Sequence, residues 1–485
     1  MTTYTPKSPL HAADRSEAMN KLAVEKLLSG KVKTMHSNLK IPGMATFFLR
    51  VAVVAMISQA LCPVASFAVP QIPGADPKQP VALVGGTIHT VSGDVIEGGI
   101  LLFERGRIVA VGKTVEIPES AKRVDVQGKH LYPGLFDAQT NMGLVEINSV
   151  RATIDETEVG DINPNVRAQA AFNPDSEHIP VTRSNGVLLT GVVPAGSLLR
   201  GRAAVMQLDG WTWEDMAVRG DVAMHLRWPT VHGDGERSGE PPSSGQLEQR
   251  ERQIAALQQT MERAKAYHRA QDAEPGRHPI DVRWESLRPV LQGVMPVAIE
   301  AWDISDIQAA VSFSDAWKLK MILVGGYDAL DCAELLKSRN IPVVVSGVHR
   351  LPLRRSDDYD AAYTFPARLH AAGIRFCISS AGRFGAANVR NLGNHAGMAV
   401  AFGLNHNEAL KAITLSPAQI LGVADRVGSL EAGKDATLIM TDGDPLETTT
   451  QVLRAFVQGR EVDLGDRHKS LAKKYEEKLR RQSKP

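Results

Sequence analysis

The side chains that most often carry catalytic chemistry are present in this chain, but their spacing is unusual for a metal or nucleophile site. The 485 residues include 14 histidines and 3 cysteines. No two histidines are separated by a single residue, and neither Cys332 nor Cys377 has a CxxC or CxxH neighbour. A zinc centre held through sulfur is therefore not predicted. No Gly-x-Ser-x-Gly elbow occurs either, so covalent catalysis has no support in the sequence.

Carboxylates gather in the segment from Glu146 to Asp161, which also contains Asp155, Glu156 and Glu158. Such a group can bind Ca²⁺ or a cationic substrate. The regular odd-position spacing of a calcium loop is absent, which favours a solvated loop. The alternating strand and helix pattern of residues 131–425, described below, predicts a barrel, and the segment follows its first strand. It should therefore lie on the face where barrel enzymes build their sites.

Polar and aromatic side chains that suit a pocket occur in three further segments, Phe172–Ser176, Ile179–Arg183 and Gln207–Trp213. The alternative is that Pro, Asn and Asp shape turns there while Trp fills the core. The sequence does not separate these two interpretations.

The overall charge excludes one class of partner. Lys and Arg number 55 against 54 Asp and Glu, for a net charge of +1. This balance gives no electrostatic reason to expect a nucleic-acid partner. A hydrophobic fraction of 43% is ordinary for a soluble protein. The chain length predicts one large core plus a smaller domain.

Residues 1–68 have the pattern of an N-terminal extension followed by a secretory signal peptide. Arg50 precedes the apolar run Val51–Leu61, and small residues follow at Ser66 and Ala68. The run is too short to span a bilayer comfortably, so no membrane span is expected in the mature chain, although a single anchor remains the alternative. The sequence thus predicts an exported protein, periplasmic or secreted.

The two ends of the mature chain share one pattern. Residues 69–130 contain short β-branched runs punctuated by glycine, such as Val81–Val84 and Arg107–Val111. Residues 426–465 repeat that pattern. Two β-rich segments around one long middle predict a single small β-sandwich domain formed from both chain ends.

The middle of the chain, residues 131–425, alternates apolar runs such as Met321–Val324 and Pro342–Val345 with helical stretches. This alternation predicts an α/β fold, most simply a (β/α)₈ TIM-like barrel. Residues 233–280 interrupt it as an insertion that ends in a charged helix. Residues 466–485 are expected to form a helical tail.

Motifs at both ends of the predicted barrel resemble those of the amidohydrolase superfamily, closest to its imidazolonepropionase-like and prolidase-like members. The run Pro133-Gly-Leu-Phe-Asp137 is similar to the start of the family's first barrel strand. The pairs Ile413-Thr414 and Pro417-Ala418, followed by the string Val427–Ala436, are similar to its final helix and its return to the β-sandwich. The resemblance covers roughly residues 81–464.

The resemblance implies a hydrolase of C–N bonds other than peptide bonds, with one or two divalent metals such as zinc at the carboxyl end of the barrel. In the family, a first-strand His-x-His supplies two ligands, because strand side chains repeat every two residues. Lys or Glu on strand four, His on strands five and six, and Asp on strand eight complete the site. The metal lowers the pKa of a bound water to near 7.

At these positions the chain carries other residue types, and amides are poor substitutes for imidazole toward zinc. No lysine candidate is evident on strand four. The candidate pocket residues at the family's ligand positions are Gln139 and Asn141 on strand one, Glu300 and Trp302 on strand five, Gly325 on strand six, and Ser380 (or Ala381) on strand eight. We therefore predict no metal and no other cofactor.

Two hypotheses remain open. In the first, the protein has lost catalysis and works as a binding or partner subunit, for an active amidohydrolase homologue or within a homo-oligomer. In the second, it is an active hydrolase that uses an atypical or metal-independent site drawn from Gln139, Asn141, Glu300 and the acidic loop.

Overall fold

The computed structural model describes residues 72–231, 242–380 and 385–482, which belong to one compact unit, Ala68–Pro485. The predicted extension and signal peptide at residues 1–68 lie outside the described residues. Within the described ranges, no helix is long and apolar enough to cross a membrane. Cys332 and Cys377 are buried and unpaired.

One of two sheets is built from both ends of this unit, as the sequence predicts. Its strand order is β16-β15-β14-β5-β1-β2-β3, with β4 paired to β1. The strands are β1 (Val81–His89), β2 (Val95–Glu104), β3 (Arg107–Gly112), β4 (Lys122–Asp125), β5 (His130–Pro133), β14 (Leu438–Thr441), β15 (Val452–Val457) and β16 (Arg460–Val462).

This sheet closes over a core of its own. Leu83 of β1 and Leu438 of β14 are fully buried in it. The Phe103 ring of β2 meets the Phe456 ring of β15, with centroids 5.3 Å apart. Strands distant in the sheet order therefore bury apolar surface against one another, which joins the two chain ends into one structural element.

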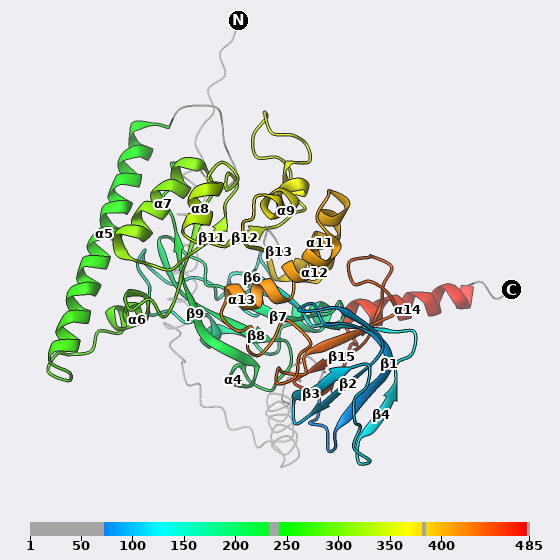
Figure 1. Cartoon of the computed structure of the whole chain (residues 1–485). Helices are drawn as coiled ribbons and strands as arrows, with labels where there is room; N and C mark the ends of the chain where they lie inside the picture. The colour runs from blue at the N-terminus through cyan, green and yellow to red at the C-terminus, as the bar shows by residue number, and fades with distance from the viewer. Residues whose placement is uncertain (1–71, 232–241, 381–384, 483–485) are drawn as a thin grey trace, which may run out of the picture. The chain divides into compact units, whose positions relative to one another are not determined.

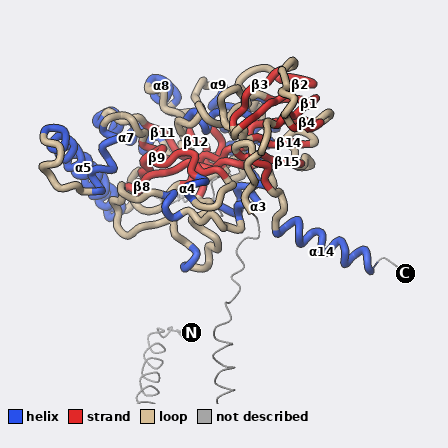
Figure 2. Tube along the Cα trace, turned by 90° about the horizontal axis from the view of Figure 1, so that it is seen from below, coloured by secondary structure: helices blue, strands red, loops and turns tan. Residues whose placement is uncertain are grey.

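The second sheet is an eight-stranded barrel with the order β13-β12-β11-β10-β9-β8-β7-β6, and the two groups of strands are visible in Figures 1 and 2. This arrangement confirms the predicted fold class. The barrel strands are β6 (Leu135–Thr140), β7 (Val187–Val192), β8 (Leu199–Gln207), β9 (Ala217–Arg227), β10 (Val297–Ala301), β11 (Met321–Gly325), β12 (Val343–Ser346) and β13 (Phe376–Ser379).

One barrel strand departs from the parallel arrangement that the alternating pattern predicts. β8 runs antiparallel to both β7 and β9. Only residues 193–198 connect β7 to β8, and residues 208–216 connect β8 to β9. A parallel crossover needs a dozen or more residues, so these connections permit only hairpins. The start of β8 consequently lies at the carboxyl ends of its neighbours.

Helices cover the barrel and lie between its strands. They are α3 (His178–Arg183), α4 (Trp213–Met216), α5 (Ser244–Ala273), α6 (Val282–Leu291), α7 (Ile304–Trp317), α8 (Ala333–Ser338), α9 (Ala361–Ala371), α10 (Gly385–Asn388), α11 (Leu392–Ala401), α12 (His406–Ala412), α13 (Leu415–Ile420) and α14 (Arg467–Gln482). The described residues also contain three short 3₁₀ helices, η1 (Arg151–Thr153), η2 (Ala168–Ala171) and η3 (Val389–Asn391).

The charged helix of the predicted insertion is α5. Ser243 and Gln246 form a capping box at its start, which satisfies backbone N–H groups of the first turn. Leu257, Met261 and Ala264 are buried. Their spacing of three or four residues places them on one face, so α5 packs one side onto the protein and exposes the other.

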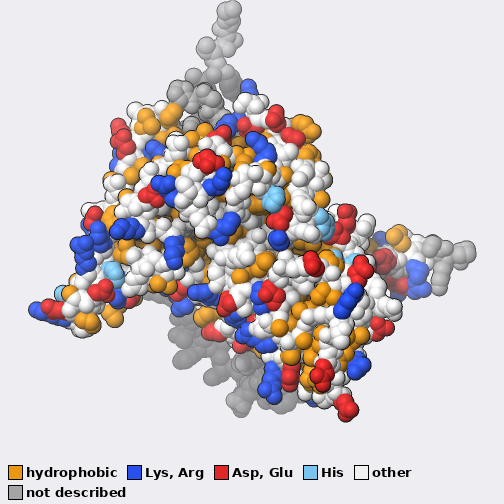
Figure 3. Space-filling model, viewed as in Figure 1, with side chains coloured by type: hydrophobic (Ala, Val, Ile, Leu, Met, Phe, Trp, Pro, Cys, Tyr) orange, Lys and Arg blue, Asp and Glu red, His pale blue; other side chains and the backbone are white. Residues whose placement is uncertain are grey.

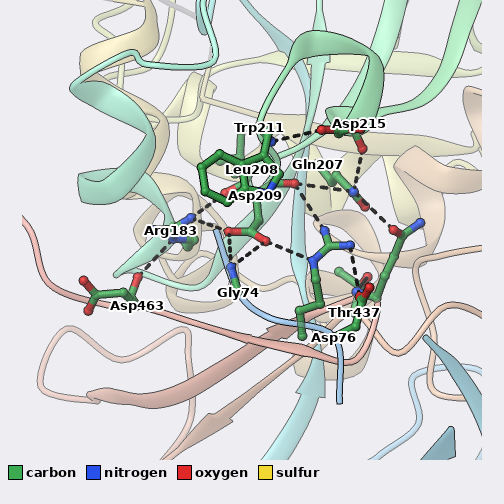
Figure 4. Close-up of polar contacts among 12 residues, drawn as sticks. Gly74, Asp76, Arg183, Gln207, Leu208, Asp209, Trp211, Asp215, Thr437 and Asp463 are labelled. Atoms are coloured by element: carbon green, nitrogen blue, oxygen red, sulfur yellow. Dashed lines mark hydrogen bonds and ion pairs between the residues drawn. The ribbon is translucent and has the colours of Figure 1, made fainter. Parts of the chain in front are cut away.

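A buried polar network joins the sheet built from the chain ends to the barrel, and Figure 4 shows it around Asp209. The Asp209 carboxylate accepts from Arg183 Nη1 at 3.1 Å and from Arg460 Nε at 3.2 Å. The backbone N–H of Gly74 donates to the same carboxylate at 3.3 Å. Arg183 and Asp209 come from segments that suit a pocket by sequence, but here they bond structural neighbours. Trp211 of the same segments is 68% exposed, so it does not fill the core as the alternative expects.

Candidate functional site

All six predicted pocket residues lie at or just beyond the carboxyl ends of barrel strands. Gln139 is in β6 and Asn141 follows it, Glu300 is in β10 and Trp302 follows it, Gly325 ends β11, and Ser380 follows β13. This end of the barrel, together with the start of the antiparallel β8, is called the barrel mouth below. Barrel enzymes place their active sites at this end.

An ion pair occupies the mouth between β8 and β10. Arg200 Nη1 lies 2.6 Å from Glu300 Oε2, and their side chains are only 11% and 15% exposed. Arg200 Nε also donates to the carbonyl oxygen of Gly196 at 3.0 Å. Arg200 reaches the mouth because β8 is antiparallel and begins there. The carboxylate at a predicted ligand position is thus already paired with a permanent cation.

A histidine inside the barrel was not among the residues predicted from sequence. His225 of β9 is buried and alternates with Met224 and Leu226, which pack in the outer core, whereas Ala223 packs inside the barrel. Burial, reinforced by the charge of Arg200, lowers the pKa of His225 to about 3. The imidazole is therefore neutral at neutral pH. The period-two alternation along β9 was the signal that could have revealed it.

The Trp302 ring fills the space beside β11. Gly325 has φ +83°, and a Cβ added there would lie 3.0 Å from the ring. Few residues other than glycine adopt this backbone conformation without strain. The indole and the glycine thus fit each other, and neither offers a metal-binding atom.

The two predicted residues at the end of β6, Gln139 and Asn141, are bound by neighbouring protein groups. Gln139 Oε1 accepts from Ser346 Oγ of β12 at 3.4 Å. Asn141 Oδ1 accepts from the backbone N–H of Ala386 at 2.7 Å, and its Nδ2 donates to Glu156 at 3.0 Å. Both ends of the Asn141 amide are therefore engaged. The contact with Glu156 brings the acidic segment to the mouth, as its position in the chain predicts.

A buried carboxylate joins the first and last strands of the barrel. Asp137 of β6 is fully buried and accepts from Ser379 Oγ at 2.5 Å, from the Ser380 backbone N–H at 3.0 Å and from Ser380 Oγ. Burial raises the pKa of Asp137, although these hydrogen bonds oppose the shift. Ser380 thus contacts a structural carboxylate at the barrel seam.

Outside the mouth, an imidazole and a carboxylate meet where His406 Nε2 lies 2.5 Å from Asp444 Oδ2. In the part of the chain that the structure describes, no group of three or more His, Cys, Asp or Glu residues has a geometry that could hold a metal ion. In the acidic segment, Glu146 accepts from Asn173 while Glu158 accepts from the backbone of Val159. The carboxylates of the segment are dispersed among separate partners, which is the arrangement of a solvated loop.

The chain is similar to known proteins in part of its sequence and in its fold. The amidohydrolase family profile matches residues 321–462. An amidohydrolase from Thermotoga maritima MSB8 superimposes with a TM-score of 0.70 at 23% identity, over 79% of this chain and 99% of that one. These matches make residues 321–462 similar to the amidohydrolase family and give the chain the fold of an amidohydrolase.

Two curated relatives align with parts of the chain. Amidohydrolase tasK from Hapsidospora irregularis is 23% identical over 394 residues, which is 74% of this chain and 39% of that protein. N-substituted formamide deformylase from Arthrobacter pascens is 42% identical over 59 residues, 11% of each chain. This chain therefore spans less than half of the length of the curated relatives it matches. The imidazolonepropionase-like or prolidase-like assignment stays a prediction.

The barrel mouth does not fit the metal centre that the resemblance to amidohydrolases implies. A divalent ion needs several free donor atoms that converge on one point. Here the amide of Asn141 bonds protein groups at both ends, Glu300 is paired with Arg200, and Trp302 covers Gly325. The guanidinium also repels a second cation. The loss of the metal site itself stays a prediction.

Proposed function

We propose that this amidohydrolase-fold protein does not perform the metal-dependent hydrolysis of its family and works as a binding or partner subunit. The Arg200–Glu300 ion pair carries the proposal. Arg200 Nη1 lies 2.6 Å from Glu300 Oε2, and both side chains are mostly buried. The Arg200 guanidinium therefore puts a fixed positive charge where metal cations are expected. His225, which Arg200 helps to keep neutral, lies in the same part of the barrel.

The remaining candidate residues support this proposal through their contacts. Asn141 and Ser380 hold structural partners, so moving them onto a metal would break hydrogen bonds inside the protein. Glycine at 325 has no side chain, and the adjacent indole leaves no room for one. Restoring a family ligand at one position would therefore require several coupled changes.

A hydrolysis assay tests the proposal. The purified full chain, loaded with Zn²⁺ or Mn²⁺ or treated with a chelator, is presented with a broad panel of amides, dipeptides and lactams. We expect no turnover above buffer in any condition, and no gain or loss in Glu300→Gln. Turnover that metal restores and a chelator abolishes would contradict the proposal.

The alternative hypothesis, an active hydrolase with an atypical site, has a distinct signature in the same assay. Metal-independent turnover that Glu300→Gln or Gln139→Ala removes would establish it. Asp315→Asn is a suitable control, because Asp315 pairs with Arg339 and both side chains are 44–47% exposed. Loss in the control as well would indicate a folding effect and would not support that alternative.

We propose as partner either an active amidohydrolase homologue or a second copy of this chain. A co-purifying amidohydrolase with intact histidines, or a dimeric mass in light scattering, is the expected result, and a solitary monomer contradicts it. We propose no nucleic-acid partner, because Lys and Arg are interspersed with Asp and Glu on the face in Figure 3. We also propose export, which predicts a mature N-terminus near residue 69.

A further inference from the structure

The C-terminal helix α14 has an apolar stripe that the described protein leaves uncovered. None of its 16 residues, Arg467–Gln482, is buried. Leu471, Tyr475 and Leu479 are 40%, 54% and 64% exposed. Their spacing of four residues places them on one side of the helix, because side chains at i and i+4 are neighbours.

The rest of α14 is strongly basic. Seven Lys and Arg side chains stand against two Glu. Glu477 accepts from Arg480 at 2.7 Å and from Arg481 at 2.8 Å, which uses one of the two acids within the helix. Lys474 and Lys478 lie three residues after Leu471 and Tyr475, so they flank the apolar stripe. The stripe is therefore bordered by uncompensated positive charge.

The hydrogen bonds at the start of α14, and one contact with the rest of the protein, involve residues before the stripe. The Asp466 carboxylate accepts from the backbone N–H of Lys469 at 2.9 Å, and its carbonyl oxygen accepts from Ser470 Oγ at 2.9 Å. His468 meets Arg390 at 3.4 Å. Figures 1 and 2 both show the helix leading away from the two sheets toward the C-terminus. Its distal turns are thus open to a large surface.

We propose that α14 docks on an anionic membrane surface, with Leu471, Tyr475 and Leu479 inserted at the boundary between headgroups and acyl chains. A helix with a polar, Lys/Arg-rich face and an apolar stripe lies in this plane. Anionic lipids attract the basic flanks, and long lysine side chains reach the headgroups while their stems cover apolar surface.

Charge decides against a second copy of the helix as the occupant. Two α14 stripes packed together would bring the flanking lysines of both helices close to one another, and like charges at such distances repel. An anionic bilayer instead complements the whole basic surface. The proposal is independent of the chemistry at the barrel mouth. A test of membrane binding by α14 and a test of hydrolysis can therefore succeed or fail separately.

Vesicle sedimentation of the full chain tests the proposal. Vesicles of phosphatidylcholine alone are compared with an equal mixture of phosphatidylcholine and phosphatidylglycerol. We expect sedimentation with the anionic vesicles only. Raising the salt from about 0.05 M to about 0.5 M should release the protein, because screening then acts within a few ångström.

Paired substitutions locate the binding surface. Leu471→Ser with Leu479→Ser, and separately Lys474→Glu with Lys478→Glu, should each lower the bound fraction about tenfold or more. The matched controls are Ile280→Ser with Leu351→Ser, at side chains 73% and 81% exposed, and Lys113→Glu with Arg123→Glu. The controls should bind like the original chain, and all variants should keep its unfolding temperature.

Three results would overturn the proposal. The first is equal binding to neutral and anionic vesicles, and the second is unchanged binding by both α14 variants. The third is a stripe variant that converts a dimer into a monomer in light scattering while no form of the chain sediments with vesicles. That outcome would assign the stripe to a contact between copies.

Discussion

The barrel mouth and the polar network around Asp209, called the junction below, each contain a buried arginine–carboxylate pair. The two pairs differ in how completely protein groups enclose them. At the junction, Asp209 is 1% exposed and accepts from two guanidinium groups and a backbone N–H. At the mouth, Glu300 is 15% exposed and pairs with Arg200 alone among the contacts described. The Asp209 carboxylate is enclosed by three protein donors, whereas Glu300 has one and keeps a small exposed fraction.

This difference separates a structural network from a candidate binding site. A fully buried carboxylate that loses its charge leaves its arginines unpaired in a medium of low dielectric constant. The mouth pair, whose side chains are 11% and 15% exposed, should lose less, because only one arginine is left without its charged partner. We therefore expect the junction to determine stability, and the mouth to be the place where a ligand or partner meets a fixed charge.

The largest difference in stability between the two sites is expected when one carboxylate at each site is neutralised. Asp209→Asn should lower the free energy of unfolding by about 3–5 kcal/mol, because Arg183 and Arg460 lose their charged partner. Glu300→Gln should cost only about 1–2 kcal/mol. Urea unfolding measures both, with Asp315→Asn expected within about 0.5 kcal/mol of the original chain. Equal losses at the two sites would refute the distinction.

The fit between Trp302 and Gly325 gives the next largest effect. Gly325→Ala should lower the free energy of unfolding by about 2–3 kcal/mol, because the positive φ and the ring both oppose a Cβ. Gly373→Ala is the matched control, since φ is +72° and nothing lies within 4 Å of the added carbon. It should cost about 1 kcal/mol.

A double-mutant cycle checks the cause of that difference. If the ring is responsible, Gly325→Ala should cost no more than Gly373→Ala once Trp302 is replaced by Leu. A penalty at position 325 that persists without the indole would show that Trp302 is not what excludes a side chain there.

Acid should weaken the barrel through its buried histidines. Burial lowers the folded-state pKa of His225 and of His395 to about 3, against 6.5 in the unfolded chain. Between these values the unfolded chain binds more protons, so stability is complete above pH 6.5 and falls as the pH drops toward 3. The largest slope is about 1.4 kcal/mol per pH unit for each histidine.

Thermal unfolding at a series of pH values measures this loss. His225→Gln should make the decline between pH 6.5 and 4 shallower, because one of the groups that must be protonated is removed. His468→Gln is the control, because His468 lies on α14, where no residue is buried. An unchanged decline in His225→Gln would contradict the neutral, buried state of that imidazole.

Local patterns were sufficient to predict the fold, because strand alternation, glycine turns and the Pro133-Gly134 motif act within a few residues of one another. The antiparallel β8 was missed because the short connections at residues 193–198 and 208–216 were not used to exclude a crossover. Arg200 was missed because it meets Glu300 across 100 positions in the chain. The partner of a carboxylate over that distance is a property of the folded barrel, which no sequence spacing records.

The metal content of the purified full chain tests the central claim most directly. After incubation with excess Zn²⁺ and removal of unbound metal, elemental analysis should find far less than one equivalent of zinc per chain. The Arg200→Met variant should bind a zinc ion tightly only if the change frees Glu300 to hold it. One or two equivalents of zinc in the original chain, lost in Glu300→Gln but kept in Asp315→Asn, would contradict the account.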